Sequence, residues 1–316
     1  MGVYSKITIE DISEIISFYD LSAPVHYEET VEGISNSNFS VLLASGQKIL
    51  LKVSNDKNIE QLENEQRILH VLKKHHYPFS PGAFQTKLGK LVYQHKDYYG
   101  VIFPFISGSP PEINWDVCSQ IGRALAQLHM LDIDRDDLES IRPYDHVGYG
   151  GMNIFEYTTQ QNACSDFVLM FDKIFPHKLQ DVPYDIFPAG VIHGDLYFDN
   201  TLFLDGKLMT LLDFEQAGRG RFILDIGIAI SGGCLNDRKD NIDFSLVEKF
   251  LEGYEQVRSL TTLEKEYLNT AILVGFFSIS LWRIKRFYEG DLDQSKKYNY
   301  RELLVRADNF NKALSD

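Results

Sequence analysis

Short β-type runs of apolar residues mark the first third of the chain. Residues 38–44 and 48–54 form two such runs, and Ser45-Gly46-Gln47 between them predicts a β-hairpin. Two further strands are predicted at residues 89–94 and 99–105. Because consecutive strands joined by short turns pair antiparallel, the pattern predicts an antiparallel sheet in this region.

Two amphipathic helices accompany these strands. Thr8 followed by Asp11 is typical of a helix start, and residues 58–75 have the spacing of a second helix. The apolar faces that we expect consist of Ile12, Ile15, Ile16 and Tyr19 in the first helix, and of Leu62, Ile68, Leu69 and Leu72 in the second.

The pattern becomes mainly helical after the Gly- and Pro-rich connector at residues 105–111. We therefore predict two lobes, a nucleotide-binding lobe at 1–106 and a catalytic and substrate lobe at 107–316. Residues 132–151 are polar and are expected to form a loop, and 201–214 form a second predicted hairpin. Helices are predicted at 115–131, 166–178, 245–257, 262–288 and 300–314. The fold class is α+β, with a small antiparallel-sheet lobe and a larger, mainly helical lobe.

Polar residues with the chemistry of phosphoryl transfer flank the second hairpin. That reaction needs a carboxylate to accept the proton of the attacking hydroxyl, and oxygen ligands for Mg²⁺. His193-Gly194-Asp195-Leu196 with Asn200 matches the pattern H-x-D-L-x-x-x-N, and Asp213-Phe214-Glu215 follows the next strand. We predict Asp195 as the base and Asn200 and Asp213 as metal ligands. His193 would fix the backbone of the loop. The alternative is a buried hairpin with a polar turn. The presence of Asp213-Phe214-Glu215 after the second strand disfavours it.

A buried ion pair is predicted in the first lobe. Lys52 lies within an apolar strand, where an unpaired ammonium is costly. Glu65 on the following helix is its expected partner, with Glu63 as a competitor, and such a pair can position the α- and β-phosphates of a nucleotide. The alternative is that Lys52 lies on an exposed strand face.

Further nucleotide contacts are predicted from weaker signals. The turn at residues 33–39 offers backbone N–H donors at Ser35, Asn36 and Ser37 that can cover phosphates. Phe103, Phe105 and Ile106 lie where a strand meets the connector, and adenine can bind there; an ordinary strand end is the alternative. Asp225 is a lone acid in an apolar helix start, with a structural role as a cap or a brace of the 193–200 loop.

These residues resemble a known superfamily. The segment HGDLYFDN, the DFE element and the helix ending at His129 are similar to aminoglycoside phosphotransferases and choline kinases, and over nearly the whole chain to protein-kinase-like homoserine kinases. The resemblance implies transfer of the γ-phosphate of ATP to the hydroxyl of L-homoserine with Mg²⁺, a step of threonine synthesis. Arg286 matches an arginine of that family and is expected, with Glu215, at the acceptor.

Three departures from those homoserine kinases point toward the wider superfamily. Residues 213–218 read DFEQAG instead of DFYFAC, Gly194 replaces an alanine, and Lys52 replaces an apolar residue. The acceptor alternatives are therefore an aminoglycoside, choline or another small hydroxyl compound. A nucleotide-binding pseudokinase is a third hypothesis, which the intact set of Asp195, Asn200 and Asp213 disfavours.

Composition and charge limit the other partners. A net charge of −14 disfavours nucleic acid and anionic lipid, which both require excess Lys and Arg. The uncharged apolar run at 270–282 is too short to span a bilayer. The three separated cysteines predict free thiols, and we expect a cytoplasmic protein that binds no membrane. The sequence leaves the oligomeric state and the choice between ATP and GTP open.

Overall fold

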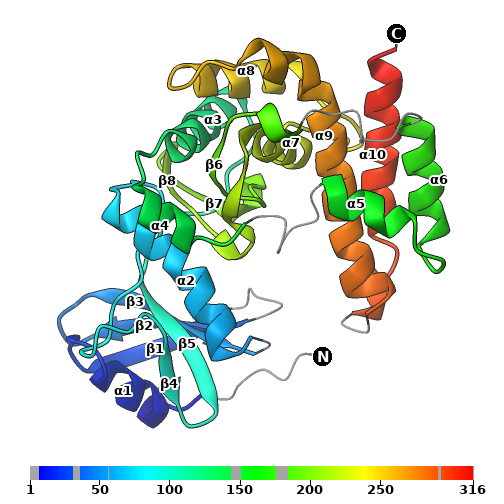
Figure 1. Ribbon diagram of the computed structural model, residues 1–316. Helices are drawn as coiled ribbons and strands as arrows, with labels where there is room; N and C mark the ends of the chain where they lie inside the picture. The colour runs from blue at the N-terminus through cyan, green and yellow to red at the C-terminus, as the bar shows by residue number, and fades with distance from the viewer. Residues whose placement is uncertain are drawn as a thin grey trace. The chain divides into compact units, whose positions relative to one another are not determined.

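The computed structural model describes residues 7–30, 36–55, 57–143, 151–175, 184–290 and 293–315. The chain divides into two compact units, Met1–Ser107 and Gly108–Asp316 (Figure 1). The boundary predicted from the sequence, between residues 106 and 107, lies one residue before this division.

The first unit contains a five-stranded antiparallel sheet in the order β1-β2-β3-β5-β4. Its strands are β1 (Pro24–Thr30), β2 (Asn36–Leu43), β3 (Lys48–Ser54), β4 (Tyr93–His95) and β5 (Tyr98–Pro104), and its helices are α1 (Ile9–Ser17) and α2 (Ile59–Lys74). Figure 1 shows these elements in blue to cyan.

The core of this unit forms where α1 packs on one face of the sheet. In β3 the side chains alternate between the core and the other face, so Ile49, Leu51 and Val53 are buried while Lys52 projects from the opposite face. A capping box starts α1 as predicted, since the Thr8 hydroxyl accepts the Asp11 N–H at 3.2 Å and the Asp11 carboxylate accepts the Thr8 N–H at 3.0 Å. The buried face of α1 consists mainly of Ile12, Ile15 and Ile16, and Tyr19 follows the helix.

Two elements of the first unit differ from the predictions. Strand β1 was not predicted, because it is a mostly exposed edge strand whose sequence PVHYEET has no apolar alternation. The strand predicted at 89–94 is confined to Tyr93–His95, since Gly89 lies in a turn with φ of 74°. Helix α2 is bounded by Asn58 and His75, as predicted.

The second unit is mainly helical. Its helices are α3 (Trp115–His129), α4 (Arg135–Ser140), α5 (Gly151–Thr158), α6 (Ser165–Ile174), α7 (Phe222–Gly233), α8 (Phe244–Glu255), α9 (Thr262–Arg283) and α10 (Tyr300–Ala313). Two short antiparallel pairs join β6 (Ala189–Ile192) to β9 (Gly218–Arg221), and β7 (Thr201–Leu204) to β8 (Lys207–Leu211). The predicted turn of the second hairpin has both Asp205 and Gly206 at positive φ, 50° and 75°.

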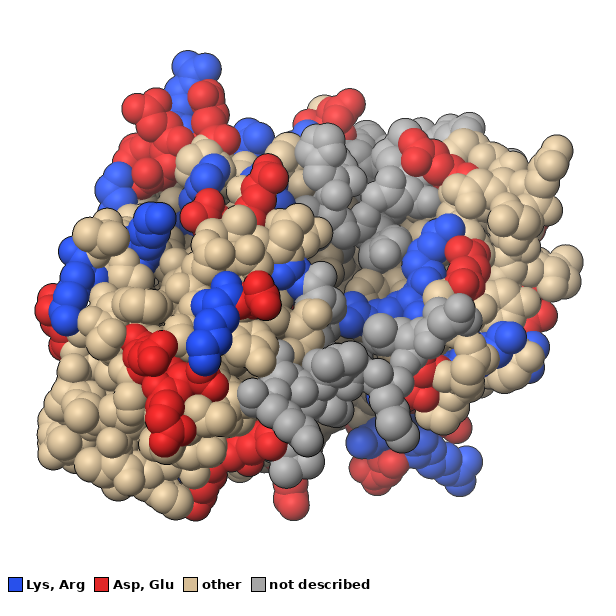
Figure 2. Space-filling view, turned by 90° about the horizontal axis from the view of Figure 1, so that it is seen from below, with Lys and Arg blue, Asp and Glu red and all other residues tan. Residues whose placement is uncertain are grey.

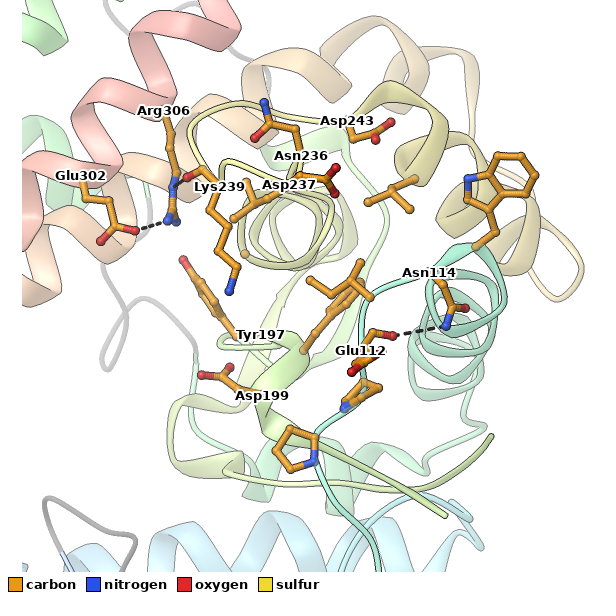
Figure 3. A pocket seen from close by; sticks show the side chains of 18 of the residues that line it. Glu112, Asn114, Tyr197, Asp199, Asn236, Asp237, Lys239, Asp243, Glu302 and Arg306 are labelled. Atoms are coloured by element: carbon orange, nitrogen blue, oxygen red, sulfur yellow. Dashed lines mark hydrogen bonds and ion pairs between the residues drawn. The ribbon is translucent and has the colours of Figure 1, made fainter. Parts of the chain in front are cut away.

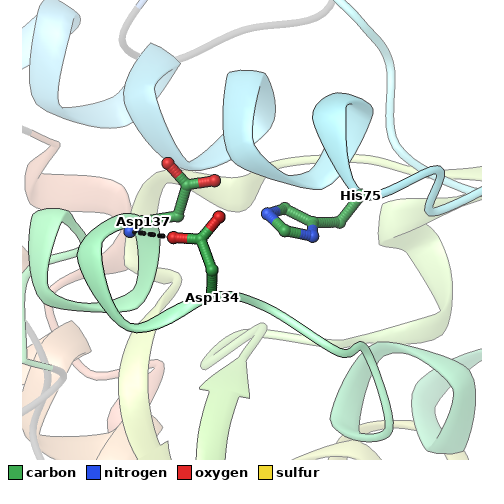
Figure 4. A group of neighbouring side chains, drawn as sticks. All are labelled: His75, Asp134 and Asp137. Carbon is green, nitrogen blue, oxygen red and sulfur yellow. Dashed lines mark hydrogen bonds between the residues drawn. The ribbon is translucent and has the colours of Figure 1, made fainter.

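The segment predicted as a loop at 132–151 contains helical structure. Helix α4 begins after Asp134, whose carboxylate accepts the Asp137 N–H at 2.9 Å (Figure 4), and α5 begins at Gly151. The prediction of a continuous loop was wrong for α4, because an N-cap with acidic residues in the first turn stabilises a short helix that has no apolar face. Residues 144–150 lie outside the described part of the chain.

Helix α9 is the central helix of the second unit and packs against α7 and α10. A π-helical turn at Ile284–Tyr288 extends it, and the resulting helix Thr262–Tyr288 is long and apolar enough to cross a membrane by length and composition alone. However, 61% of its apolar window is buried inside the protein, which is typical of a core helix. The α+β fold with a sheet-containing lobe and a helical lobe is confirmed.

Candidate functional site

The predicted base lies in a loop between two strands of the second unit, residues 193–200. Strand β6 ends at Ile192, and the loop runs through Asp195 to a 3₁₀ turn at Phe198–Asn200 that leads into β7. On the other side of the hairpin, β8 ends at Leu211 and Asp213 follows. The strand ends thus place the three predicted residues, Asp195, Asn200 and Asp213, on short rigid segments.

Asp225 of α7 holds the backbone of the 193–200 loop. Its Oδ2 accepts the His193 N–H at 2.7 Å and its Oδ1 accepts the Gly194 N–H at 2.8 Å. Gly194 has φ of 77°, a backbone conformation that glycine adopts without strain. Asp225 therefore braces the loop, one of the two roles considered from the sequence, while its position inside α7 is not that of a helix cap.

The His193 ring connects the loop to the end of the hairpin. Its Nε2–H donates to the Leu212 carbonyl at 2.9 Å, and its Nδ1 accepts the Asp195 N–H at 3.3 Å. Burial lowers the pKa of His193, so the neutral imidazole required by this donor and acceptor pair is favoured. Phe214 lies against the same ring, with centroids 4.5 Å apart.

A buried network orients the Asp225 carboxylate. His129 Nε2 lies 3.0 Å from Asp225 Oδ2, and its Nδ1 lies 2.6 Å from the Tyr254 hydroxyl. Arg258 also donates to that hydroxyl, at 3.1 Å. Burial alone would raise the pKa of Asp225, but the hydrogen bonds from His129 and from the His193 backbone outweigh it and leave the pKa below its usual range. Asp225 is therefore a buried carboxylate that accepts three hydrogen bonds.

Asn200 and Asp213 have the donor chemistry of a magnesium site. The Asn200 amide Nδ2 donates to the Asp195 carbonyl at 2.9 Å. The amide oxygen Oδ1 takes no part in this bond. The Leu212 N–H donates to the Asn200 carbonyl at 2.8 Å and closes the base of the hairpin, so Asn200 and Asp213 lie near each other. Asp213 has the left-handed conformation, with φ of 59° and ψ of 58°. Carboxylate and amide oxygens are the ligands that Mg²⁺ prefers.

Negative charge accumulates around Asp195. Burial raises the pKa of Asp195 well above its usual value, and the charges of Asp213 and Glu215 raise it further. A cation bound at Asn200 and Asp213 would offset this repulsion and lower that pKa again. The residues present therefore fit a divalent metal ion.

The first unit contains the predicted ion pair. Lys52 Nζ lies 3.6 Å from Glu65 Oε1, while the competitor Glu63 is exposed on α2. Lys57, which was not predicted as a member of the pair, donates to the other oxygen of Glu65 at 3.0 Å. Burial would raise the pKa of Glu65, but the charges of Lys52 and Lys57 outweigh it and hold the pKa below its usual value. Glu65 is thus ionised between two lysines.

The other residues proposed for nucleotide binding have varied surroundings. Ser35 lies outside the described residues, and Asn36 begins β2. The Ser37 hydroxyl is buried and lies 3.2 Å from Asn55 Nδ2, which donates to it. Phe103 is buried within β5, while the Phe105 N–H donates to the Lys48 carbonyl at 3.2 Å and Ile106 follows the strand. Their roles stay predictions.

A cavity of about 1010 Å³ opens in the second unit beside the 193–200 loop (Figure 3). Tyr197, Phe198 and Asp199 of that loop form part of its wall. Apolar and neutral polar residues line part of the remainder, together with charged residues of both signs: Glu112, Asp116, Asp237, Lys239, Asp243, Arg283, Glu302 and Arg306. A cavity of this size accommodates a small polar molecule.

The roles of the two residues predicted for the acceptor, Glu215 and Arg286, stay predictions. Glu215 belongs to a 3₁₀ turn at Phe214–Gln216, and its carbonyl accepts a hydrogen bond from Arg142. The Arg286 guanidinium lies over the Trp282 ring, 5.1 Å from its centroid. Neither lines the cavity, whereas Arg283, three residues before Arg286, does. The lining residues were not predicted, since they come from separate segments with no common motif.

The comparisons with known proteins agree with this architecture. The sequence profile described as "Phosphotransferase enzyme family" matches residues 26–265. A homoserine kinase of Neisseria meningitidis serogroup B is 26% identical over 96% of this chain and 99% of its own length. An amicoumacin kinase solved with AMP-PNP, Ca²⁺ and Ami has a TM-score of 0.70, with 14% identity over 96% of each chain. A microcompartment-associated aminopropanol kinase has a TM-score of 0.69, with 16% identity over 97% of this chain and 98% of that one.

The profile covers most of the chain, and the relatives and the solved structures cover nearly all of it. The proteins that it resembles are named as kinases of small molecules, and the segment that matches H-x-D-L-x-x-x-N is the loop whose backbone Asp225 holds. The chain therefore belongs to the phosphotransferase enzyme family, as a small-molecule kinase.

Proposed function

We propose that the protein transfers the γ-phosphate of ATP to the side-chain hydroxyl of L-homoserine, giving O-phosphohomoserine and ADP for threonine synthesis. The observation that carries the proposal is Asp195, a carboxylate with a raised pKa on a braced loop beside the oxygen ligands of Asn200 and Asp213. Homoserine is chosen as the acceptor because curated relatives named homoserine kinase align over most of this chain and of their own length.

Each proposed residue has a defined role in the transfer. The ionised Asp195 carboxylate accepts the proton of the acceptor hydroxyl while that oxygen forms a bond to the γ-phosphorus. The bond between the γ-phosphorus and the bridging oxygen of the β-phosphate breaks, and ADP leaves. Asn200 and Asp213 would hold Mg²⁺, which neutralises charge on the phosphates when bound.

The proposal assigns nucleotide binding to the first unit and the acceptor to the second. In the first unit, Lys52 held by Glu65 is the group that would contact the α- and β-phosphates. In the second, the cavity beside the 193–200 loop is lined by charges of both signs, which suits a zwitterion. The three cysteines are free and buried in the structure, which supports the proposed cytoplasmic location.

The test is a coupled assay of ADP release with an acceptor panel. L-Homoserine, 3-amino-1-propanol, choline, spectinomycin and an aminoglycoside would each be supplied at millimolar concentration with ATP, with and without Mg²⁺. We expect Mg²⁺-dependent turnover with homoserine, confirmed by detection of phosphohomoserine. Turnover with another acceptor but not with homoserine would assign a different substrate, and ADP release at background with every acceptor would support the pseudokinase hypothesis.

A further inference from the structure

Three cationic side chains line the cavity beside the 193–200 loop, and two of them have counter-charges. Arg283 donates to the Asn299 carbonyl at 2.9 Å and lies 3.3 Å from the Glu302 carboxylate. The buried Arg306 donates through Nη2 to the other carboxylate oxygen of Glu302, Oε1. Glu302 therefore satisfies both arginines.

Lys239 is the third cation and differs from the two arginines. Its exposed ammonium makes no ion pair or hydrogen bond with any residue that the structure describes. Figure 3 shows the side chain extending into the cavity, with its ammonium directed toward the region of Tyr197 and Asp199. Among the cations that line the cavity, Lys239 is thus the one without a bonded counter-ion in the described part of the chain, although unbonded carboxylates line the same cavity.

The backbone of Lys239 is fixed in an uncommon conformation. Its φ is 55°, a left-handed value that is unfavourable for a residue with a β-carbon. The Arg306 Nε donates to the Lys239 carbonyl at 2.7 Å, and the Lys239 N–H donates to the Asn236 carbonyl at 2.8 Å. These two bonds hold the lysine backbone from both sides, so the fold sets the direction in which the side chain leaves the backbone.

We infer that Lys239 binds the carboxylate of the acceptor, and that the acceptor is an α-amino acid with a side-chain hydroxyl. This inference rests on the proposed function and names the residue that selects for the acid. Asp199 and Asp237 line the same cavity and have no bonded partner among the described residues, so they offer carboxylates to the ammonium of the amino acid. Because Tyr197, Phe198 and Asp199 also line this cavity, an acceptor held there lies beside the 193–200 loop.

The inference separates acceptors by charge. A hydrogen bond between a lysine and a carboxylate contributes about 1.5–3 kcal/mol, which corresponds to about 10- to 100-fold in kcat/KM. An acceptor without a carboxylate has nothing to gain from Lys239. The enzyme should therefore prefer L-homoserine to 3-amino-1-propanol, and removing the lysine charge should abolish most of that preference.

The experiment compares Lys239→Met with a matched control. Arg238→Met removes a positive charge from the next residue of the same loop, which is exposed and does not line the cavity. We expect Lys239→Met to lower kcat/KM for homoserine about 10- to 100-fold and to change that for 3-amino-1-propanol less than about threefold. Arg238→Met should retain both values, and Lys239→Arg should recover part of the homoserine activity.

Binding gives a readout that does not depend on turnover. Homoserine should raise the thermal midpoint of the wild-type protein and of Arg238→Met, and it should raise that of Lys239→Met much less. If the wild type phosphorylates homoserine and Lys239→Met does so equally well, the inference is wrong while the proposed function stands. If the preferred acceptor of the wild type carries no carboxylate, both are wrong.

Discussion

Asp195 is the single residue on which the proposed chemistry depends most. Asn would keep its size and remove the carboxylate that accepts the proton, so Asp195→Asn should lower kcat by about 10²- to 10⁴-fold. Because the loop is held through its backbone by Asp225, the fold should be retained. Steady-state kinetics and the thermal midpoint would be measured together.

The matched control for this variant is Asp205→Asn. Asp205 is an exposed acid in the turn of the same hairpin, with φ of 50°, a conformation that Asn adopts readily. Its kcat should equal that of the wild type. Equal kcat values for Asp195→Asn and the wild type would remove Asp195 from its proposed role.

Asp11 makes the first unit sensitive to acid. Its carboxylate accepts hydrogen bonds from Lys96 at 2.5 Å and from the Thr8 N–H at 3.0 Å, and it lies 3.0 Å from His95 Nε2. The bond from Lys96 contributes most to holding the pKa of Asp11 far below its usual range. A lowered pKa stabilises the fold above the pKa of the unfolded state, about 3.9, and that contribution is lost as the pH falls through the folded value.

The prediction concerns Asp11→Asn at two pH values. At pH 7 it should lower the free energy of unfolding by about 1–3 kcal/mol, and the difference from the wild type should shrink below about pH 4. Urea denaturation at pH 7 and pH 3.5 measures it. Glu10→Gln, an exposed acid of the same helix, should show no such pH dependence. A difference that grows in acid would mean that the Asp11 carboxylate does not stabilise the fold in its ionised form.

At the scale of elements, α7 and α9 approach closely because glycines lie at their contact. A β-carbon on Gly227 would come within 2.3 Å of the Ala271 carbonyl oxygen, and one on Gly275 would come within 2.6 Å of the Ser231 hydroxyl. The same α7 carries Asp225. The position of the brace for the 193–200 loop therefore depends on this packing.

Gly227→Ala should consequently lower both stability and activity. Pushing α7 from α9 should cost about 1–3 kcal/mol of unfolding free energy and lower kcat as Asp225 shifts, while KM for ATP changes little. Asn269→Ala, on the exposed side of α9, is the control and should leave both quantities unchanged. A wild-type kcat in a destabilised Gly227→Ala variant would show that the packing of α7 on α9 does not set the position of Asp225.

The elements that could be predicted are those determined by residues close together in the sequence. The hairpin of β2 and β3 follows from apolar runs around Gly46, and Asp195, Asn200 and Asp213 lie within one short segment whose hairpin closes between Asn200 and Leu212. Strand β1 could not be predicted, because it is recruited by pairing with β2 and buries little of its own surface.

The cavity could not be predicted for a different reason. Tyr197, Lys239, Arg283 and Arg306 lie far apart in sequence and meet only through the packing of helices against the 193–200 loop. No local pattern distinguishes Lys239 from Arg238 beside it. Similarly, Arg283 at the end of α9 lines the cavity, whereas Arg286 in the π-helical turn that follows does not.

At the scale of the whole molecule, the net charge and the burial of the longest apolar helix both affect whether the protein binds lipid membranes. The chain has a net charge of −14, and on the face shown in Figure 2 acidic side chains are interspersed with basic ones. The apolar helix Thr262–Tyr288 is mostly buried. Repulsion from anionic headgroups and the burial of this helix should therefore both prevent lipid binding.

We expect the protein to remain in the supernatant when vesicles of phosphatidylcholine, with or without phosphatidylserine, are sedimented at physiological salt. Binding to the neutral vesicles would show that the helix leaves its core position. Binding that needs the anionic lipid would instead reveal a local basic surface that outweighs the net charge.

Glu65 has two lysine partners, and this redundancy affects how the enzyme can evolve. A buried carboxylate that loses its only partner costs about 3–5 kcal/mol, which selection would remove. Here Lys57 still neutralises Glu65 when position 52 mutates. A descendant that exchanges Lys52 for an apolar residue should therefore keep a folded first unit. Such an exchange removes the proposed contact with the nucleotide phosphates, so it persists only where another group holds them.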